Sequence, residues 1–167
     1  DKSFKMTVAP AGSLTMKDGQ IKVYSLENNG SLSLADLDSD YAANVTTAYT
    51  SGSDSNLTTY VYGDGSTGGI KAASATLAGK WTIKPGISYY RTGKTVITGK
   101  AVSAESTTGN FDETVGYEYD LKSPTLSFSL ADSSLSNPTI SVARKSYADF
   151  ASDSSEIAKA LDSVADD

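Results

Sequence analysis

Few residues of this sequence have the type and spacing that metal binding requires. Asp36, Asp38 and Asp40 alternate as the first ligands of a calcium loop do, because hard cations are held by convergent carboxylate oxygens. However, position six of such a loop is Tyr41 instead of glycine, and position twelve is Thr47 instead of glutamate. The pattern favours a solvated acidic turn, and no metal site is assigned to the chain.

Two glycine-rich segments have the letters of nucleotide-binding motifs without their context. "GDGSTG", residues 63–68, matches G-x-G-x-x-G and follows the strand-like "TTYVY". A dinucleotide site needs its third glycine to open a helix, whereas strand and turn residues follow here. In "GISYYRTGKT", six residues separate Gly86 from Gly93, where a phosphate loop has four. We expect no cofactor at either segment.

Catalytic chemistry has few candidates. The chain contains no cysteine and no histidine, which excludes thiolate catalysis and a Ser-His-Asp triad. Asp112 and Glu113 could act as acid and base only in a cleft that separates their pKa values. Tyrosines at 89–90, 117 and 119 could stack on sugar or peptide, but covering a sheet surface is the favoured interpretation. We predict that the chain itself is not an enzyme and has no catalytic residue.

Composition and charge exclude further classes. A chain of 167 residues fits one domain. Its 14 Lys and Arg against 20 Asp and Glu give a net charge of -6, which repels phosphate backbones and anionic lipids. We therefore expect no nucleic-acid partner and no direct membrane insertion. The chain starts at Asp1 without an export leader, which favours a processed or excised piece.

Short runs with period-two alternation predict the elements that must position any site. They are "FKMTV", "SLTM", "QIKVYSL", "GSLSL", "TTYVY", "TVIT", "TLSFSL" and "TISVAR", separated by Gly, Asn, Asp or Pro. Thr, Val, Ile and Tyr favour a pleated, half-buried surface. The sequence therefore predicts an all-β chain up to about residue 142.

One internal repeat indicates stacked coils. "AGSLTM" and "NGSLSL" align Gly12 with Gly30 and Leu14 with Leu32. In a solenoid, equivalent aliphatic positions stack because no coil buries its apolar face alone. We predict parallel strands over residues 4–35, with Leu14 and Leu32 adjacent. The polar segment 36–56 is predicted to be an irregular insertion with at most a short strand near Val45.

The last residues predict a short helix. Asp153 can be its N-cap, with Glu156 as the reciprocal partner of a capping box. Ile157, Leu161 and Val164 then follow at i, i+4 and i+7 and form one apolar stripe.

The C-terminal half resembles the end of a bacterial autotransporter passenger domain. The resemblance lies in the order of "LAGKWTIKPGISYYRTGKTVITGKAV", "GNFDETV", "SPTLSFSL", "NPTISVARKSYADFA" and "SSEIAKALDSV" over about residues 77–164. In that family, a "PG-x-x-Y" turn and a "G-x-F" turn precede a strand ending in Arg plus an aromatic residue, and an "A-x-x-LD" helix follows. The matching residues are Pro85, Gly86, Tyr89, Gly109, Phe111, Pro124, Leu126, Val142, Arg144, Tyr147, Phe150, Ile157, Ala158, Leu161 and Asp162.

This resemblance implies a right-handed parallel β-helix, or solenoid, with a C-terminal cap and a short terminal α-helix. Residues 1–76 would form coils with the insertion near 36–56. Residues 77–150 would form the last coils and an autochaperone-like cap, and residues 151–167 a helical linker toward an outer-membrane barrel. Leu126, Phe128, Ile140, Val142, Tyr147 and Phe150 would cover the last coil.

The implied function is that of a stem and autochaperone segment, which promotes folding and secretion at the bacterial cell surface by type V secretion. Its partners would be its own barrel and the upstream passenger, with a host-surface protein or glycan as a further partner. The passenger would be anchored at the outer membrane or secreted, as part of an adhesin or a virulence factor. A subtilisin-like protease domain could precede the segment in the parent.

Two alternatives remain open at this point. A β-sandwich adhesion or surface-layer module that binds glycan or protein would use the same Thr- and Tyr-rich strands, but as antiparallel hairpins. A carbohydrate-processing β-solenoid would need paired acids on one concave face, and the sequence displays no such pair.

Overall fold

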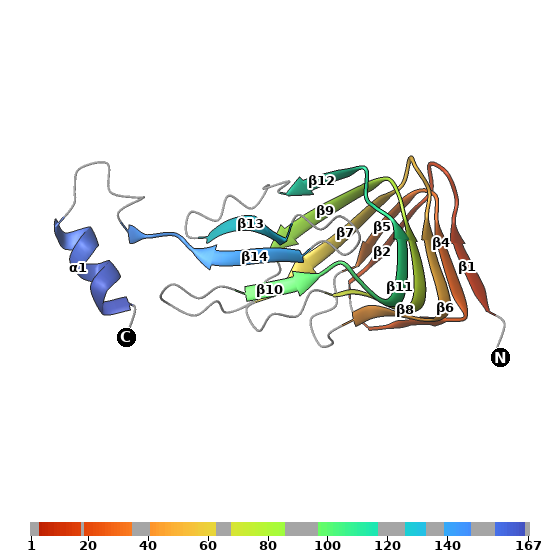
Figure 1. The fold of residues 1–167 in the computed structure, drawn as a ribbon, viewed down its shortest axis with the longest axis horizontal. Coiled ribbons are helices and arrows are strands. Elements are labelled where there is room, and N and C mark those ends of the chain that lie inside the picture. Colours follow the sequence, from red (N-terminus) through yellow and green to blue (C-terminus); the bar gives the residue numbers. More distant parts are fainter. Residues whose placement is uncertain are drawn as a thin grey trace.

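The computed structural model describes residues 4–17, 19–34, 41–62, 68–85, 97–116, 126–132, 139–147 and 156–165. Over these ranges the protein is built mainly of β-strands and has one helix, α1 (Glu156–Ala165). The predicted all-β class with a short terminal helix is confirmed to this extent. Figure 1 shows two layers of strands at the N-terminal end, a smaller group beside them, and α1 at the opposite end.

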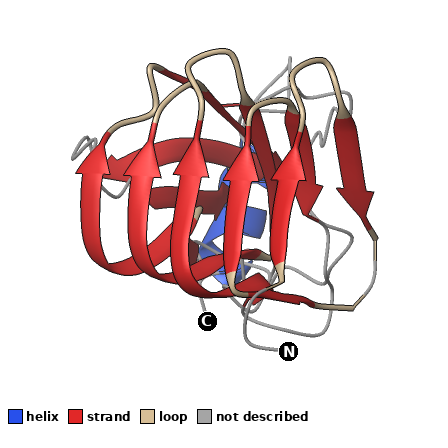
Figure 2. Cartoon of the chain, turned by 90° about the vertical axis from the view of Figure 1, so that its right-hand side faces the viewer, coloured by secondary structure: helices blue, strands red, loops and turns tan. Residues whose placement is uncertain are grey.

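The first sheet has the order β1 (Lys5–Val8), β4 (Ser25–Asn28), β6 (Tyr41–Ser51), β8 (Gly69–Leu77) and β11 (Val102–Gly109), and β3 (Ile21–Val23) also pairs with β6. The second sheet has the order β12 (Glu113–Gly116), β9 (Lys80–Pro85), β7 (Asn56–Val61), β5 (Ser31–Leu34) and β2 (Ser13–Met16). Every pairing in these two sheets is parallel. Figure 2 shows neighbouring strands with their arrows pointing the same way.

The third sheet differs from the other two because its strands are antiparallel. It has the order β10 (Ile97–Lys100), β14 (Thr139–Arg144) and β13 (Leu126–Asp132). Parallel neighbours need a crossover between them, whereas β13 and β14 can pair as consecutive strands. The mode of pairing therefore changes at the C-terminal side of the two parallel sheets.

The chain alternates between the first two sheets, and this alternation stacks equivalent residues. Leu14 pairs with Leu32, Leu32 with Leu57, and Leu57 with Trp81 along the second sheet. The predicted register of Leu14 and Leu32 is confirmed. In the first sheet, Ile21, Ala43, Ile70 and Val102 form a comparable row. These rows belong to one hydrophobic core, so each strand contributes its alternate residues to the same interior.

The prediction of an irregular insertion at 36–56 was wrong over most of its length. Residues 41–51 form β6, the longest of the described strands, which lies at the centre of the first sheet. Ala42, Ala43, Val45 and Tyr49 are buried, while polar side chains alternate with them or face outward. The interior positions are partly occupied by alanine, so the apolar alternation is weak in the sequence. Register shifts between Tyr41 and Ala43 and between Val45 and Ala48 also interrupt its period of two. Residues 36–40 lie outside the described ranges.

The helix α1 begins at Glu156, and a 3.3 Å ion pair joins its side chain to Lys159. The predicted N-cap, Asp153, lies outside the described residues. Two members of the apolar stripe are exposed, Ile157 to 77% and Leu161 to 49%. No helix in the described ranges is long and apolar enough to cross a membrane.

Tyr49 has an unusual position within the core. It is fully buried on β6, and its hydroxyl oxygen has no hydrogen-bond partner of regular geometry. Burial raises the pKa of Tyr49 to about 12 from 10.0, and the nearby side chains of Asn28 and Ser51 offset part of that rise. The folded state therefore favours the neutral phenol.

Tyr49→Phe is expected to leave stability at pH 7 unchanged or to raise it by about 1 kcal/mol, because a buried hydroxyl without a partner is removed. Above pH 10 the unfolded tyrosine loses its proton while the folded one keeps it. The free energy of unfolding of the wild type should then fall by about 1.4 kcal/mol per pH unit relative to that of the variant, up to about pH 12. Urea unfolding of both proteins between pH 8 and pH 11 measures this difference. A constant difference over that range would contradict the assignment.

Candidate functional site

Most residues that the sequence singled out for chemistry lie outside the described ranges. This applies to Asp36, Asp38 and Asp40, to residues 63–67 and 86–96, and to the tyrosines at 89–90, 117 and 119. Gly68, the last glycine of "GDGSTG", leads directly into strand β8 instead of a helix. Within the described part of the chain, no cluster of three or more acidic residues is arranged to hold a metal ion.

Asp112, which was considered as an acid or a base, makes hydrogen bonds to the backbone of Gly79. Its Oδ2 atom accepts a 2.9 Å hydrogen bond from the backbone N–H of Gly79, and its own N–H donates a 2.7 Å bond to the Gly79 carbonyl. Gly79 has a φ of +75°, in the left-handed region that glycine tolerates. Asp112 lies between β11 and β12, the next pair of strands, and its carboxylate therefore stabilises the corner between β8 and β9.

Similar corners recur along the stack. The carbonyls of Gly12, Gly30 and Ser55 accept backbone bonds from Ser31, Asn56 and Lys80, which begin or precede the next strand of the second sheet. The buried amide of Asn28 supports this row, since its Nδ2 donates to the Asn56 carbonyl at 3.2 Å and its Oδ1 accepts from Gly30 N at 3.3 Å. Backbone groups at the corners are thus satisfied by the neighbouring pair of strands.

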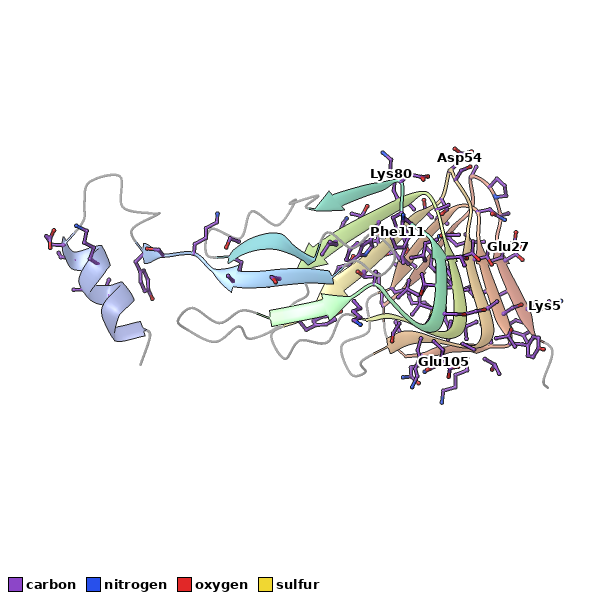
Figure 3. All side chains as sticks on the ribbon, in the orientation of Figure 1. Lys5, Glu27, Asp54, Lys80, Glu105 and Phe111 are labelled. Carbon is purple, nitrogen blue, oxygen red and sulfur yellow. The ribbon has the colours of Figure 1, made fainter. Side chains whose placement is uncertain are left out.

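The C-terminal junction brings together several residues named by the autotransporter resemblance. Phe111 stacks on Trp81, with ring centroids 6.0 Å apart, and Figure 3 shows it between the layers. Leu126 and Val142 of the third sheet are buried in the same core. Phe128 and Val142 pair across the hairpin backbone, as do Leu130 and Ile140. Pro124 and Phe150 lie outside the described residues, and Tyr147 is half-buried.

A groove on the outer surface of the first sheet is a concave feature in the described part of the chain. Its volume is about 810 Å³. It is lined by Phe4, Lys22, Val23, Tyr24, Asn44, Val45, Thr46, Lys71, Ala72, Ala73 and Glu105. These residues come from the chain before β1, from β3 and its end, and from β6, β8 and β11.

The bend between β3 and β4 shapes this groove. The Tyr24 carbonyl accepts bonds from both the backbone N–H of Thr47, at 2.9 Å, and its hydroxyl, at 2.6 Å. Tyr24 N–H donates to the Phe4 carbonyl at 2.8 Å, so both aromatic residues lie at this bend. Their side chains are unusually exposed, Phe4 to 57% and Tyr24 to 38%. Figure 3 shows Glu105 on the outside of the layers.

Sequence reasoning did not find the groove. Its side chains are spread from Phe4 to Glu105, and only the strand pairing aligns Lys22 with Asn44 and Asn44 with Lys71. The one available signal was the pair of large apolar residues Phe4 and Tyr24. Both lie at strand ends, where the alternating pattern does not place a core residue.

Comparisons with protein families, curated proteins and solved structures gave no significant match for this chain. The autotransporter resemblance thus stays a prediction based on the order of its motifs.

Proposed function

We propose that the chain is a stem of an autotransporter passenger and that its C-terminal part is an autochaperone segment for folding at the cell surface. The proposal includes a right-handed parallel β-helix as the architecture. One observation carries it, namely that the chain alternates between two parallel sheets whose equivalent residues stack in register. Such a molecule extends by adding coils, which suits a spacer.

The structural role follows from how each coil is stabilised. Leu32 and Leu57 are completely buried, and each is paired with core residues of the adjacent strands. Burial of such a side chain contributes about 1.5–3 kcal/mol, so a coil without a neighbour loses much of its stability. A stack of this kind needs a cover at each end and a place from which folding spreads.

The third sheet supports placing that starting point near the C-terminus. Its hairpin contributes Leu126 and Val142 to the core, and antiparallel strands that are close in sequence form with a smaller loop-closure cost than parallel pairs. In a passenger that emerges C-terminus first, this hairpin with the Trp81–Phe111 pair would be available before the preceding coils.

The alternative β-sandwich module is less consistent with the pairing. Such a module needs antiparallel strands in its sheets, whereas both larger sheets are parallel. A carbohydrate-processing solenoid needs paired acids on a concave face, and the described groove is lined by one acidic residue, Glu105.

The test compares two equally small core changes at opposite ends of the stack. Val142→Ala and Val23→Ala each remove two buried methyl groups, and each should lower the free energy of unfolding by about 2 kcal/mol. The chain is placed between an N-terminal epitope tag and a standard outer-membrane autotransporter barrel. If the C-terminal part starts folding, Val142→Ala should reduce the surface-exposed tag severalfold and leave the passenger protease-sensitive. Val23→Ala should display normally.

Barrel insertion is measured separately by heat-modifiable gel mobility, and the free energy of unfolding of both purified variants is compared. Equal display of the two variants at equal loss of stability would contradict the autochaperone role. Failure of the wild-type chain to reach the surface would contradict the stem role as well.

A further inference from the structure

We propose that the groove on the first sheet binds an extended acidic oligosaccharide, with carboxylates on alternate sugars. The inference does not depend on the stem function. It starts from the register of the groove floor, where Lys22, Asn44 and Lys71 lie side by side on β3, β6 and β8. Both lysines are exposed at the outer surface, and Asn44 lies between them.

The spacing of the two lysines suits a repeating ligand. Strands in a sheet are about 4.8 Å apart, so Lys22 and Lys71 are separated by about 10 Å at the backbone. One pyranose unit in an extended chain is of similar length to one strand spacing. Because the two lysine side chains start from backbone positions at this spacing, their ammonium groups can reach carboxylates carried by every second sugar. The Asn44 amide can bond the hydroxyl groups of the sugar between them.

The aromatic end of the groove provides the second part of the site. Phe4 and Tyr24 are the two most exposed large apolar residues of the described strands and their flanking turns, and both line the groove. Aromatic rings that keep one face in water offer a flat apolar surface, and the C–H face of a sugar ring packs on such a surface. Thr46 and Glu105 add a hydroxyl and a carboxylate that can accept bonds from sugar hydroxyls.

The backbone at the groove favours a sugar over a peptide. A peptide commonly binds a sheet by adding a strand to an open edge. Strands β6 and β8 form the middle of the groove, and each pairs with strands on both sides. Over these two strands, recognition must therefore come from side chains, whereas β3 at one end of the groove pairs with β6 alone. The lining carries two lysines and one glutamate, so its local charge is positive and favours an acidic ligand even though the net charge of the chain is -6.

The test uses isothermal titration of the full chain with a hyaluronan hexasaccharide, which carries a carboxylate on alternate sugars. A neutral N-acetylglucosamine hexamer and a hexaglutamate peptide are the comparison ligands. We expect hyaluronan to bind best, with an affinity that falls as salt is raised. The double substitution Lys22→Gln/Lys71→Gln should raise Kd by more than about tenfold because two charged contacts are lost. The single substitution Tyr24→Ala should raise Kd by about tenfold because the stacking surface is lost.

Lys17→Gln is the control for a single groove substitution, Lys22→Gln, since each removes one exposed lysine, and Lys17 lies beside β2 on the second sheet and outside the groove. It should bind like the wild type. Circular dichroism of every variant checks that the fold is kept. The proposal is overturned if hexaglutamate binds as tightly as hyaluronan, if Lys17→Gln weakens binding as much as the groove variants do, or if hyaluronan does not bind.

Discussion

Trp81→Ala is expected to lower the free energy of unfolding by about 3–5 kcal/mol, the usual range for removing a large aromatic side chain from a core. Trp81 is 1% exposed and continues the stacked row of Leu14, Leu32 and Leu57. Its Nε1 donates a 3.0 Å hydrogen bond to the buried Thr59 hydroxyl. The substitution would leave a cavity beside Phe111 and take away the donor to Thr59.

Because Trp81 is the single tryptophan of the chain, urea unfolding should be followed by far-ultraviolet circular dichroism. Trp81→Phe is the control, since it keeps an aromatic ring against Phe111 and loses only part of the volume and the indole N–H. It should cost about 1–3 kcal/mol. If Trp81→Ala remained within 1 kcal/mol of wild type, the stacked row would not be the main source of stability at this end.

Gly79→Ala is expected to cost about 2–5 kcal/mol for a different reason. The φ of +75° disfavours any side chain by about 1–2 kcal/mol. A Cβ atom would also lie 2.5 Å from the Ser55 carbonyl oxygen and 2.6 Å from that of Gly52. Both atoms belong to the backbone of the preceding corner, so relief requires neighbouring pairs of strands to move apart.

Gly19→Ala separates the two contributions. Gly19 has a φ of +86° but no heavy atom within 4 Å of the position of a Cβ. It should show only the conformational cost of about 1–2 kcal/mol. The difference between the two variants, measured by urea unfolding, gives the cost of the clash at the corner. Equal losses would mean that the corner can open without strain.

The sequence allowed the strand class and one register to be predicted because period-two alternation is clear where aliphatic residues alternate with Ser and Thr. "SLTM" and "SLSL" are such strands, and their repeat located Leu14 against Leu32. The same reasoning failed for β6, where alanines occupy interior positions and register shifts interrupt the period. Propensity and alternation describe one strand at a time. They therefore do not reveal that a strand of this composition pairs on both sides at the centre of a sheet.

The groove could not be predicted for a related reason. Its lysines and aromatic residues are ordinary surface residues when considered singly. They become a site only through pairings between strands far apart in the sequence, such as Lys22 with Asn44. The connections between successive strands differ in length, so no fixed period in the sequence marks the aligned positions.

The row of corner carbonyls has a mechanical consequence. The carbonyls of Gly12, Gly30, Ser55 and Gly79 accept bonds from the backbone N–H groups of Ser31, Asn56, Lys80 and Asp112. Each of these bonds joins neighbouring pairs of strands, as do the ladders of both parallel sheets. A tensile load along the stack therefore reaches these junctions in series. Under such a load the molecule would be as strong as its weakest junction, and it would lengthen in steps as single pairs of strands detach, while the remaining strands keep their bonds.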